Sequence, residues 1–256
     1  MNNSSTQFQL LPLSNTFLFL APFECEDPVR LGNETIDGGY VIPKSMLTLA
    51  DALLSFGIGT SWKFEQHWSE FRPEVPIHSY DASTDVDTLP EHHRKMYQQF
   101  FRGPVVHFKN NIGLLNTENT VAFDTAIRKI GGRNIFIKMD IEGHEYEFID
   151  TMIDYADSVI GLVAEFHYIE PKIHNTQRQR FIDTIQHLQK KYSIVHVHGN
   201  NFGPVAADNV PDTLEITFVR SDLCKKSNYR HEFYLNGFDW PNNPHSKDFY
   251  MYIDNI

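Results

Sequence analysis

Apolar residues along the chain form two alternating patterns, short continuous runs and stretches with helical spacing. The runs read as buried strands and cover residues 52–56, 75–80, 105–108, 134–139, 159–166, 193–197 and 214–219. Helical spacing marks residues 64–71, 123–130, 149–156 and 181–188, and residues 89–101 fit a helix less clearly. Strands joined by single helices predict a parallel sheet, whereas the loop between the last two strands predicts an antiparallel pair. We therefore predict an α/β fold: a doubly wound, Rossmann-like sheet of seven strands, the last antiparallel, with helices on both faces.

The chain divides into three parts without a linker between them. Four prolines break residues 1–50 into short pieces, and this stretch reads as an N-terminal extension packed on the core. Residues 51–222 carry the alternating pattern and form the ligand-binding domain, and residues 223–256 form a C-terminal tail rich in aromatic side chains. No repeat and no Gly/Ser-rich segment occurs, so we expect one compact domain overall.

Charge and cysteine content narrow the class of partner. The 256 residues carry a net charge of −11 with His neutral, which argues against a nucleic acid as partner. Cys25 and Cys224 form neither a CxxC motif nor a zinc spacing. Residues 10–23 are apolar only in patches, follow no Lys or Arg, and are too short for a membrane span. We expect a cytoplasmic protein with no membrane span.

A glycine turn and an acid follow the first two strands, at the edge where open α/β sheets bind their ligands. Gly57 and Gly59 let the backbone approach a ligand closely, but Trp62 stands where a dinucleotide-binding turn has its third glycine. Asp81 ends the second strand, 24 residues after Gly57, a spacing typical of an acid that binds ribose hydroxyls. Taken alone, the two glycines also fit an ordinary tight turn, and Asp81 also fits a turn residue or a helix cap.

Acids and histidines follow the later strands. Asp140 and Glu142 come directly after the fourth strand. Glu165 and His167 stand two positions apart at the end of the fifth strand, so they face the same side. His198 lies at the end of the sixth strand. A helix cap explains one of these acids but not the whole group, which indicates a binding or catalytic site.

Several segments, in order along the chain, resemble the sequence signature of one enzyme family. Residues 137–145 (Ile-Lys-Met-Asp-Ile-Glu-Gly-His-Glu) resemble the central signature of FkbM-type methyltransferases. Residues 37–43 and 54–59 resemble the N-terminal signature of one subgroup of this family, and residues 198–201 and 214–218 resemble the C-terminal half of the same subgroup. The resemblance implies the Rossmann-like sheet of the methyltransferases.

The resemblance also implies S-adenosylmethionine as cofactor and the O-methylation of a sugar, a glycan or a small metabolite. The residues that it places at the cofactor are Asp37, Tyr40, Gly57, Gly59, Thr60, Ser61, Asp81, Ala82, Asn110, Asn111, Asp140 and Glu142. The two glycines would line the methionine moiety, Asp81 the ribose, and the two asparagines the adenine. The family's acid two residues before the first glycine is Ser55 here. Asp37 or Asp140 could hold the amino group of the methionine moiety instead.

Two mechanisms use the acids and histidines. In the first, His167 or His198 is the general base for the acceptor, with Asp140 and Glu165 nearby, because an imidazole has a pKa near neutrality. In the second, Asp140, Glu165 and His167 hold Mg²⁺ or Mn²⁺, since oxygen-rich ligand sets suit these ions. The sequence predicts a small-molecule or sugar acceptor, without identifying it, and leaves the oligomeric state open.

Three other functions use part of the same pattern. A metal-dependent hydrolase would need the acids and the histidine but not the glycine turn. A nicotinamide-dependent oxidoreductase shares the sheet, but the missing third glycine weighs against it. A binding module without catalysis would keep the pocket but would not need Glu165, His167 and His198 together.

Overall fold

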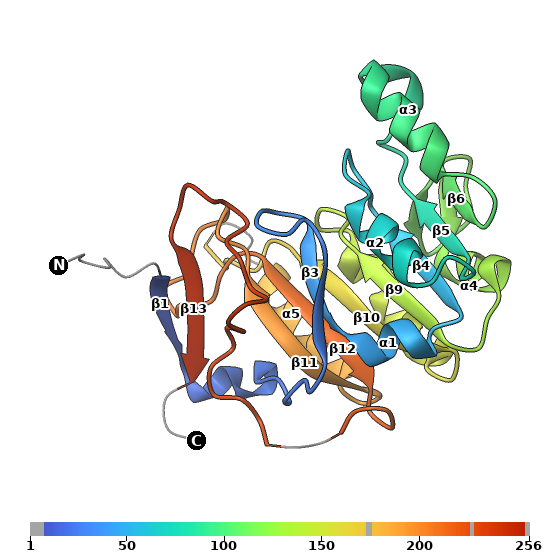
Figure 1. Ribbon diagram of the computed structural model, residues 1–256. Coiled ribbons are helices and arrows are strands. Elements are labelled where there is room, and N and C mark those ends of the chain that lie inside the picture. Colours follow the sequence, from blue (N-terminus) through green and yellow to red (C-terminus); the bar gives the residue numbers. More distant parts are fainter. Residues whose placement is uncertain (1–7, 173–175, 226–227, 254–256) are drawn as a thin grey trace.

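The computed structural model describes residues 8–172, 176–225 and 228–253, and its centre is one sheet of seven strands (Figure 1). The strands are β4 (Ala52–Phe56), β5 (Ile77–Tyr80), β6 (Val105–Phe108), β9 (Ile135–Met139), β10 (Val159–Phe166), β11 (Tyr192–Gly199) and β12 (Leu214–Arg220). They lie in the order β11-β12-β10-β9-β4-β5-β6. All neighbours from β10 to β6 pair in parallel, whereas β12 is antiparallel to both β10 and β11. The predicted α/β fold with an antiparallel last strand is confirmed.

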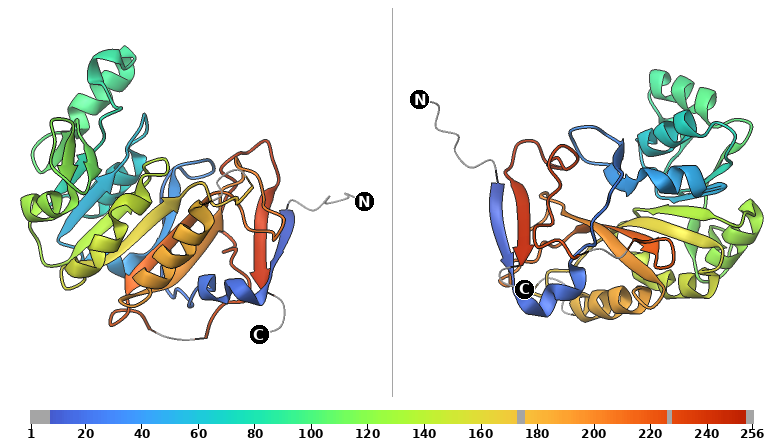
Figure 2. Two further views of the ribbon diagram at one scale, coloured as in Figure 1. Left: turned by 180° about the vertical axis from the view of Figure 1, so that it is seen from behind. Right: turned by 60° about the horizontal axis from the view of Figure 1, so that its bottom comes forward.

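Helices cover both faces of the sheet (Figure 2). They are α1 (Lys44–Leu49), α2 (Lys63–Phe71), α3 (Glu91–Phe100), α4 (Phe123–Ile130) and α5 (Gln177–Leu188), with 3₁₀ helices η1 (Asn15–Leu20), η2 (Val86–Thr88), η3 (Glu145–Glu147) and η4 (Ile149–Tyr155). Leu54 packs in the layer of α4, η4 and α5, and Leu53 in the layer of α1 and α2, because successive strand residues face opposite sides. None of the helices in the described segments has the length and apolar character needed to cross a bilayer.

The stretch predicted as a helix over residues 149–156 is a 3₁₀ helix instead. Ile149, Met152 and Tyr155 follow one another at three-residue intervals, and all three pack against the core of the sheet. A 3₁₀ helix has three residues per turn, so this spacing aligns them on one face. The α-helical spacing on which the prediction rested was Ile149, Met152, Ile153 and Ala156, and only the first two of these positions belong to the three-residue repeat.

Three small sheets flank the central one, and the sequence pattern predicts none of them. Their strands are β1 (Phe8–Leu13) with β13 (Asp248–Ile253), β2 (Pro28–Gly32) with β3 (Gly39–Pro43), and β7 (Asn111–Gly113) with β8 (Thr120–Ala122). The parallel pair of β1 and β13 joins the predicted N-terminal extension to the predicted tail (Figure 1). Residues 1–7 of that extension and residues 226–227 and 254–256 of that tail lie outside the described residues.

Candidate active site

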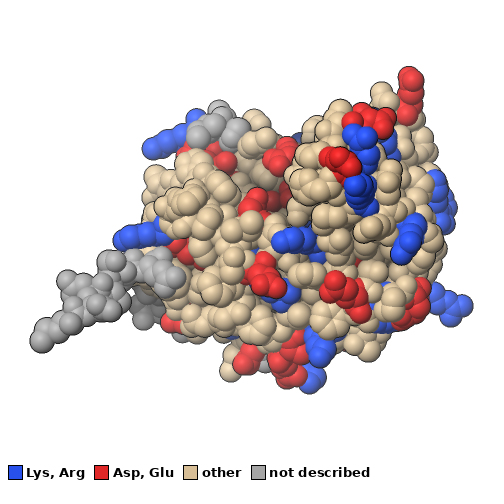
Figure 3. Space-filling model, turned by 45° about the horizontal axis from the view of Figure 1, so that its top comes forward, with Lys and Arg blue, Asp and Glu red and all other residues tan. Residues whose placement is uncertain are grey.

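A cavity of about 780 Å³ opens at the carboxyl ends of β4, β5 and β9. Of the residues predicted to bind the cofactor, those that line it are Asp37, Tyr40, Gly57, Gly59, Thr60, Ser61, Asp81, Asn111, Asp140 and Glu142. Ala82 and Asn110 are not among its lining residues. Asp and Glu side chains gather in and around the hollow on this face (Figure 3). The cavity thus brings together residues of the extension and of four different loops.

The glycine turn after β4 requires its glycines for two different reasons. Gly57 has φ +80°, and a Cβ there would lie 1.7 Å from the backbone carbonyl oxygen of Asp140. Gly59 has φ +49°, and a Cβ there would meet no atom within 4 Å. The first glycine therefore allows β4 and β9 to approach each other, and the second leaves bare backbone at the cavity.

The Asp81 carboxylate holds this turn in place. Its Oδ2 accepts hydrogen bonds from the backbone N–H groups of Ile58 (2.9 Å) and Gly59 (2.8 Å). Its Oδ1 accepts from Ser83 N (2.7 Å), Ser83 Oγ (2.6 Å) and Thr84 N (3.2 Å). Burial raises the pKa of Asp81, but these hydrogen bonds more than offset it, so the pKa is lowered. In this structure Asp81 orders the glycine turn, and a ribose hydroxyl would share its oxygens with those donors.

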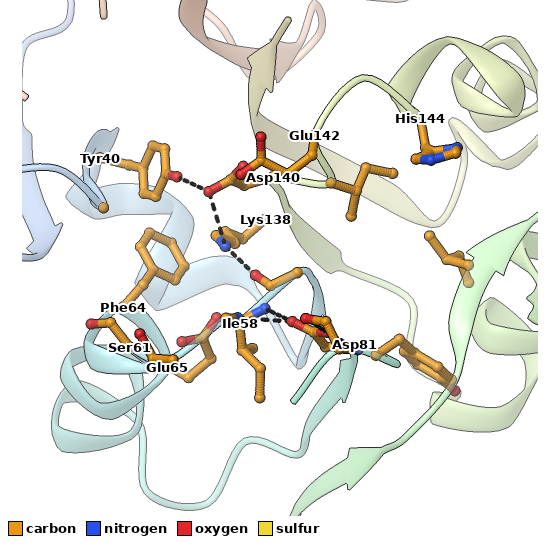
Figure 4. A pocket seen from close by; sticks show the side chains of 18 of the residues that line it. Tyr40, Ile58, Ser61, Phe64, Glu65, Asp81, Lys138, Asp140, Glu142 and His144 are labelled. Carbon is orange, nitrogen blue, oxygen red and sulfur yellow. Dashed lines mark hydrogen bonds and ion pairs between the residues drawn. The ribbon is translucent and has the colours of Figure 1, made fainter. Parts of the chain in front are cut away.

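A series of polar contacts between side chains crosses the cavity from β3 to the glycine turn (Figure 4). The Tyr40 hydroxyl donates a hydrogen bond of 2.9 Å to Asp140 Oδ2. Lys138 Nζ lies 4.0 Å from the same oxygen and donates a hydrogen bond to the backbone carbonyl of Gly57. The N-terminal extension therefore contributes a side chain to the site through Tyr40.

Glu65 is a cavity residue that the sequence reasoning missed. It lies in the first turn of α2, lines the cavity and is only 1% exposed. The Ser55 hydroxyl donates a hydrogen bond to its Oε1. Ser55 stands at the position where the FkbM-type signature has an acid, and α2 places the Glu65 carboxylate against it. That departure was the only signal for Glu65, because helical spacing gives no reason to bury a charged residue beside Phe64.

His167 stands behind the cavity wall with both ring nitrogens facing carboxylates. Nδ1 lies 3.0 Å from Glu145 Oε1. Nε2 faces Glu142 Oε2 at 3.5 Å, Glu165 Oε2 at 3.8 Å and Asp140 Oδ1 at 3.9 Å. Burial lowers the pKa of His167, but the hydrogen bond and charge of Glu145, with the charges of Asp140 and Glu142, raise it above its ordinary value.

The residue that orients His167 is Glu145, and not Glu165, which the sequence places on the same side as His167. Glu145 is fully buried in η3, and its Oε1 also accepts from the backbone N–H groups of Ile141 (3.3 Å) and Gly143 (3.2 Å). A carboxylate only accepts, so the neutral imidazole carries its proton on Nδ1 and leaves Nε2 free to take one. Glu165 faces Nε2 instead, and its Oε2 lies 3.8 Å from that nitrogen, which is too far for a hydrogen bond.

His198 lies away from the cavity, inside the sheet edge. It is 2% exposed and does not line the cavity. Its Nε2 lies 3.2 Å from Asp248 Oδ1 of β13, and its Nδ1 lies 3.4 Å from Glu215 Oε2 of β12. Burial lowers the pKa of His198, but the charge of Asp239, the hydrogen bond to Asp248 and the neighbouring Glu215 carboxylate raise it well above the ordinary value. Two buried carboxylate partners make His198 a link between strands.

Two groups of side chains in the described residues have the spacing of a cation site, and they share Glu165. The ligand atoms of Asp140, Glu165 and His167 all lie within 4.8 Å of one another, as do those of Asp37, Glu165 and Glu215. Burial raises the pKa of Glu165 well above its usual range, and the charges of Asp140, Glu215 and Asp37 raise it further. A proton or a cation is needed to balance so many carboxylates in a buried place.

No known family model matches the chain, and no curated protein sequence matches it. Several solved structures are distantly similar in fold. A protein of Clostridium thermocellum assigned as an rRNA methylase is 7% identical with a TM-score of 0.43, over 69% of this chain and 91% of the other. The fibrillarin pre-rRNA processing protein of Methanococcus jannaschii is 7% identical with a TM-score of 0.36, over 68% of each chain. The plantazolicin methyltransferase BpumL, solved with SAH, is 9% identical with a TM-score of 0.36, over 67% and 76%.

These likenesses are too distant to carry a functional assignment. The fold class rests on the strand order and directions of the sheet itself. What the molecule presents is a doubly wound α/β protein with a glycine turn, a buried acid–histidine pair and a cavity at the ligand edge of its sheet.

Proposed function

We propose that this protein is an S-adenosylmethionine-dependent methyltransferase that methylates a hydroxyl group of a sugar, a glycan or a small metabolite. One observation carries the proposal: the glycine turn opens into a cavity, and the Glu145–His167 pair stands behind the wall of that cavity, beside Asp140 and Glu142. Asp140 and Glu142 line that cavity, and His167 Nε2 lies 3.9 Å and 3.5 Å from their carboxylates. Methylation of a hydroxyl group uses a cofactor-binding site and, close to it, a base that removes the proton of the hydroxyl group.

The cavity residues fit this cofactor. The cavity volume of about 780 Å³ lies in the range of small-molecule sites. Open space over Gly59 admits a ligand against bare backbone, and Asp81 keeps the turn in that shape. Gly57 and Gly59 would hold the methionine moiety, Asp81 and Ser83 the ribose, and Asn111 with its neighbour Ile112 the adenine, since all six line the cavity. S-adenosylmethionine supplies an activated methyl group when bound.

The protein's own groups then have two tasks, alignment and proton removal. Alignment of two reactants can contribute about 7–11 kcal/mol, because it replaces a bimolecular encounter. His167 Nε2 takes the proton of the acceptor hydroxyl, and the Glu145 carboxylate at Nδ1 stabilises the imidazolium that forms. A positioned base contributes about 10²–10⁴-fold. His167→Ala should therefore lower kcat with little change in the acceptor KM.

A metal-dependent version of the same reaction uses Asp140, Glu165 and His167 as ligands. Their mutual spacing within 4.8 Å and their oxygen-rich chemistry support Mg²⁺ or Mn²⁺ at this place. Chelator should then abolish turnover and leave the affinity for S-adenosylhomocysteine unchanged. Full turnover in excess EDTA would exclude the metal-dependent mechanism and leave His167 as a general base.

The charge of the cavity argues against a phosphorylated acceptor. Asp37, Asp140, Glu142 and Glu147 line it, and Lys138 is the one Lys or Arg among its described lining residues. An acceptor with phosphates would meet repulsion from these carboxylates. Incubation with S-adenosylmethionine and panels of sugars, amines and phosphorylated sugars, followed by mass spectrometry, tests this. Methylation confined to amines or phosphorylated sugars would contradict the proposed acceptor.

Binding of the cofactor product tests the proposal most directly. Calorimetry with S-adenosylhomocysteine should show 1:1 binding, and a thermal-shift screen with S-adenosylmethionine, NAD and Mg²⁺ should show the largest shift with the first. A shift with NAD alone would favour an oxidoreductase, and a shift with Mg²⁺ alone a hydrolase. Undetectable binding of S-adenosylhomocysteine at millimolar concentration would exclude the methyltransferase.

A further inference from the structure

Two buried side chains of opposite charge face the cavity beneath the glycine turn. Glu65 comes from α2 and Lys138 from β9, and both line the cavity while being almost fully buried. In the described part of the chain they form no direct ion pair, although each acts on the other through its charge. Side chains of this kind are almost never so buried unless a partner balances them.

Each of the two has binding capacity left over. The Lys138 ammonium has three donors, and the Gly57 carbonyl takes one of them, while Asp140 Oδ2 lies 4.0 Å away. The Glu65 carboxylate receives the Ser55 hydroxyl on Oε1, and a carboxylate has about four acceptor positions. Burial raises the pKa of Glu65, and the Lys138 charge opposes that rise. A ligand group carrying both charges would complement both residues.

We propose that Glu65 and Lys138 together bind the amino-acid end of the ligand, Glu65 its α-ammonium and Lys138 its α-carboxylate. The inference rests on the proposed function, because S-adenosylmethionine carries both groups on one carbon. The hydrogen bond that the Ser55 hydroxyl of β4 donates to Glu65 Oε1 holds this carboxylate in place at the cavity. The pair selects ligands with an amino-acid end over nucleosides that lack one.

Calorimetry with matched ligands separates the two charges. The ligands are S-adenosylhomocysteine, its deaminated analogue, its decarboxylated analogue, and 5′-methylthioadenosine, which lacks both groups. Glu65→Gln should weaken binding of the two ammonium-bearing ligands by about 10–100-fold and leave the deaminated analogue unchanged. Lys138→Met should do the reverse, weakening the two carboxylate-bearing ligands and sparing the decarboxylated analogue. Neither variant should change the affinity for 5′-methylthioadenosine.

Asp140→Asn is the matched control, because Asp140 is the other carboxylate within reach of Lys138. If Asp140→Asn, and not Glu65→Gln, selectively loses the ammonium-bearing ligands, the assignment of Glu65 is overturned. Equal losses for all four ligands in Glu65→Gln would show a purely structural role, which also overturns it. The wild-type protein provides a test without any variant, since it should bind S-adenosylhomocysteine at least tenfold more tightly than the deaminated analogue.

The binding results for the wild-type protein distinguish an error in the Glu65 and Lys138 assignment from an error in the proposed function. If the wild-type protein binds none of the four ligands, the methyltransferase itself is excluded and the pair with it. If the wild-type protein binds all four with similar affinity, the adenosine site exists and only the assignment of Glu65 and Lys138 is wrong. Urea melts of each variant show whether a loss of affinity reflects a loss of folded protein.

Discussion

Glu145→Gln removes one charge from the group that orients His167 while preserving its shape. Glu145 is fully buried, and its Oε1 accepts from two backbone N–H groups as well as from His167 Nδ1. The amide oxygen of glutamine can keep those acceptor roles. Burial lowers the pKa of His167, and the hydrogen bond and charge of Glu145 are the largest of the effects that raise it. The substitution removes the charge, so the lowering effect of burial is opposed less strongly. The pKa of His167 should therefore fall.

The sign and size of the kinetic effect follow from the same geometry. The base form of His167 is the unprotonated one, so in the wild type kcat/KM should decline as the pH drops through a pKa above 6.5. In Glu145→Gln this decline should begin at lower pH. On the plateau kcat should fall by about 10²–10³-fold, the lower part of what a positioned base contributes, because Asp140 and Glu165 still flank Nε2. The free energy of unfolding should fall by about 1–3 kcal/mol.

NMR titration of the His167 ring measures the pKa without any acceptor, and EDTA keeps cations from the site. Glu142→Gln is the matched control: Glu142 Oε2 lies 3.5 Å from Nε2, but its side chain is 80% exposed, so water screens its charge. Its substitution should lower the pKa of His167 much less. An unchanged pKa in Glu145→Gln, or an equal fall in Glu142→Gln, would refute the orienting role of Glu145.

The remaining predictions concern the turn and the sheet edge. Asp81→Ala should weaken binding of S-adenosylhomocysteine by about 1.5–3 kcal/mol in calorimetry, because the turn loses its anchor; unchanged affinity would contradict this role. Gly57→Ala should prevent cofactor binding and destabilise the fold, since its Cβ would meet the Asp140 carbonyl, whereas Gly59→Ala should cost only about 1–2 kcal/mol of backbone strain in urea melts. His198→Gln should cost about 3–5 kcal/mol of stability and leave cofactor affinity intact. Because the folded-state pKa of His198 is raised, its stabilisation is complete below the unfolded-state pKa of 6.5 and is lost as the pH rises from there through the higher folded-state pKa, so wild type and variant should converge in alkaline urea melts.

The sequence alone determined the central sheet, because its strands are continuous apolar runs and its helices are apolar stripes. Local burial leaves a local pattern, so β4, β9 and β10 were predicted nearly to the residue. The short strands of the flanking sheets left no such pattern. β1 and β13 pair across almost the whole chain, and no periodicity within either segment encodes its partner. Their pairing is a long-range contact that only the folded chain decides.

The site divides in the same way. The sequence determined which loops carry it, because parallel strands bring their carboxyl ends to one edge, and so Gly57, Asp81 and Asp140 lie at one cavity. Only the tertiary structure decided which acid serves which partner. Glu65 reaches the cavity because α2 packs directly behind the glycine turn, and Glu145 reaches His167 because η3 folds back over the end of β10. Side-chain direction and helix placement fix such contacts, and neither is written in the spacing of residues along the chain.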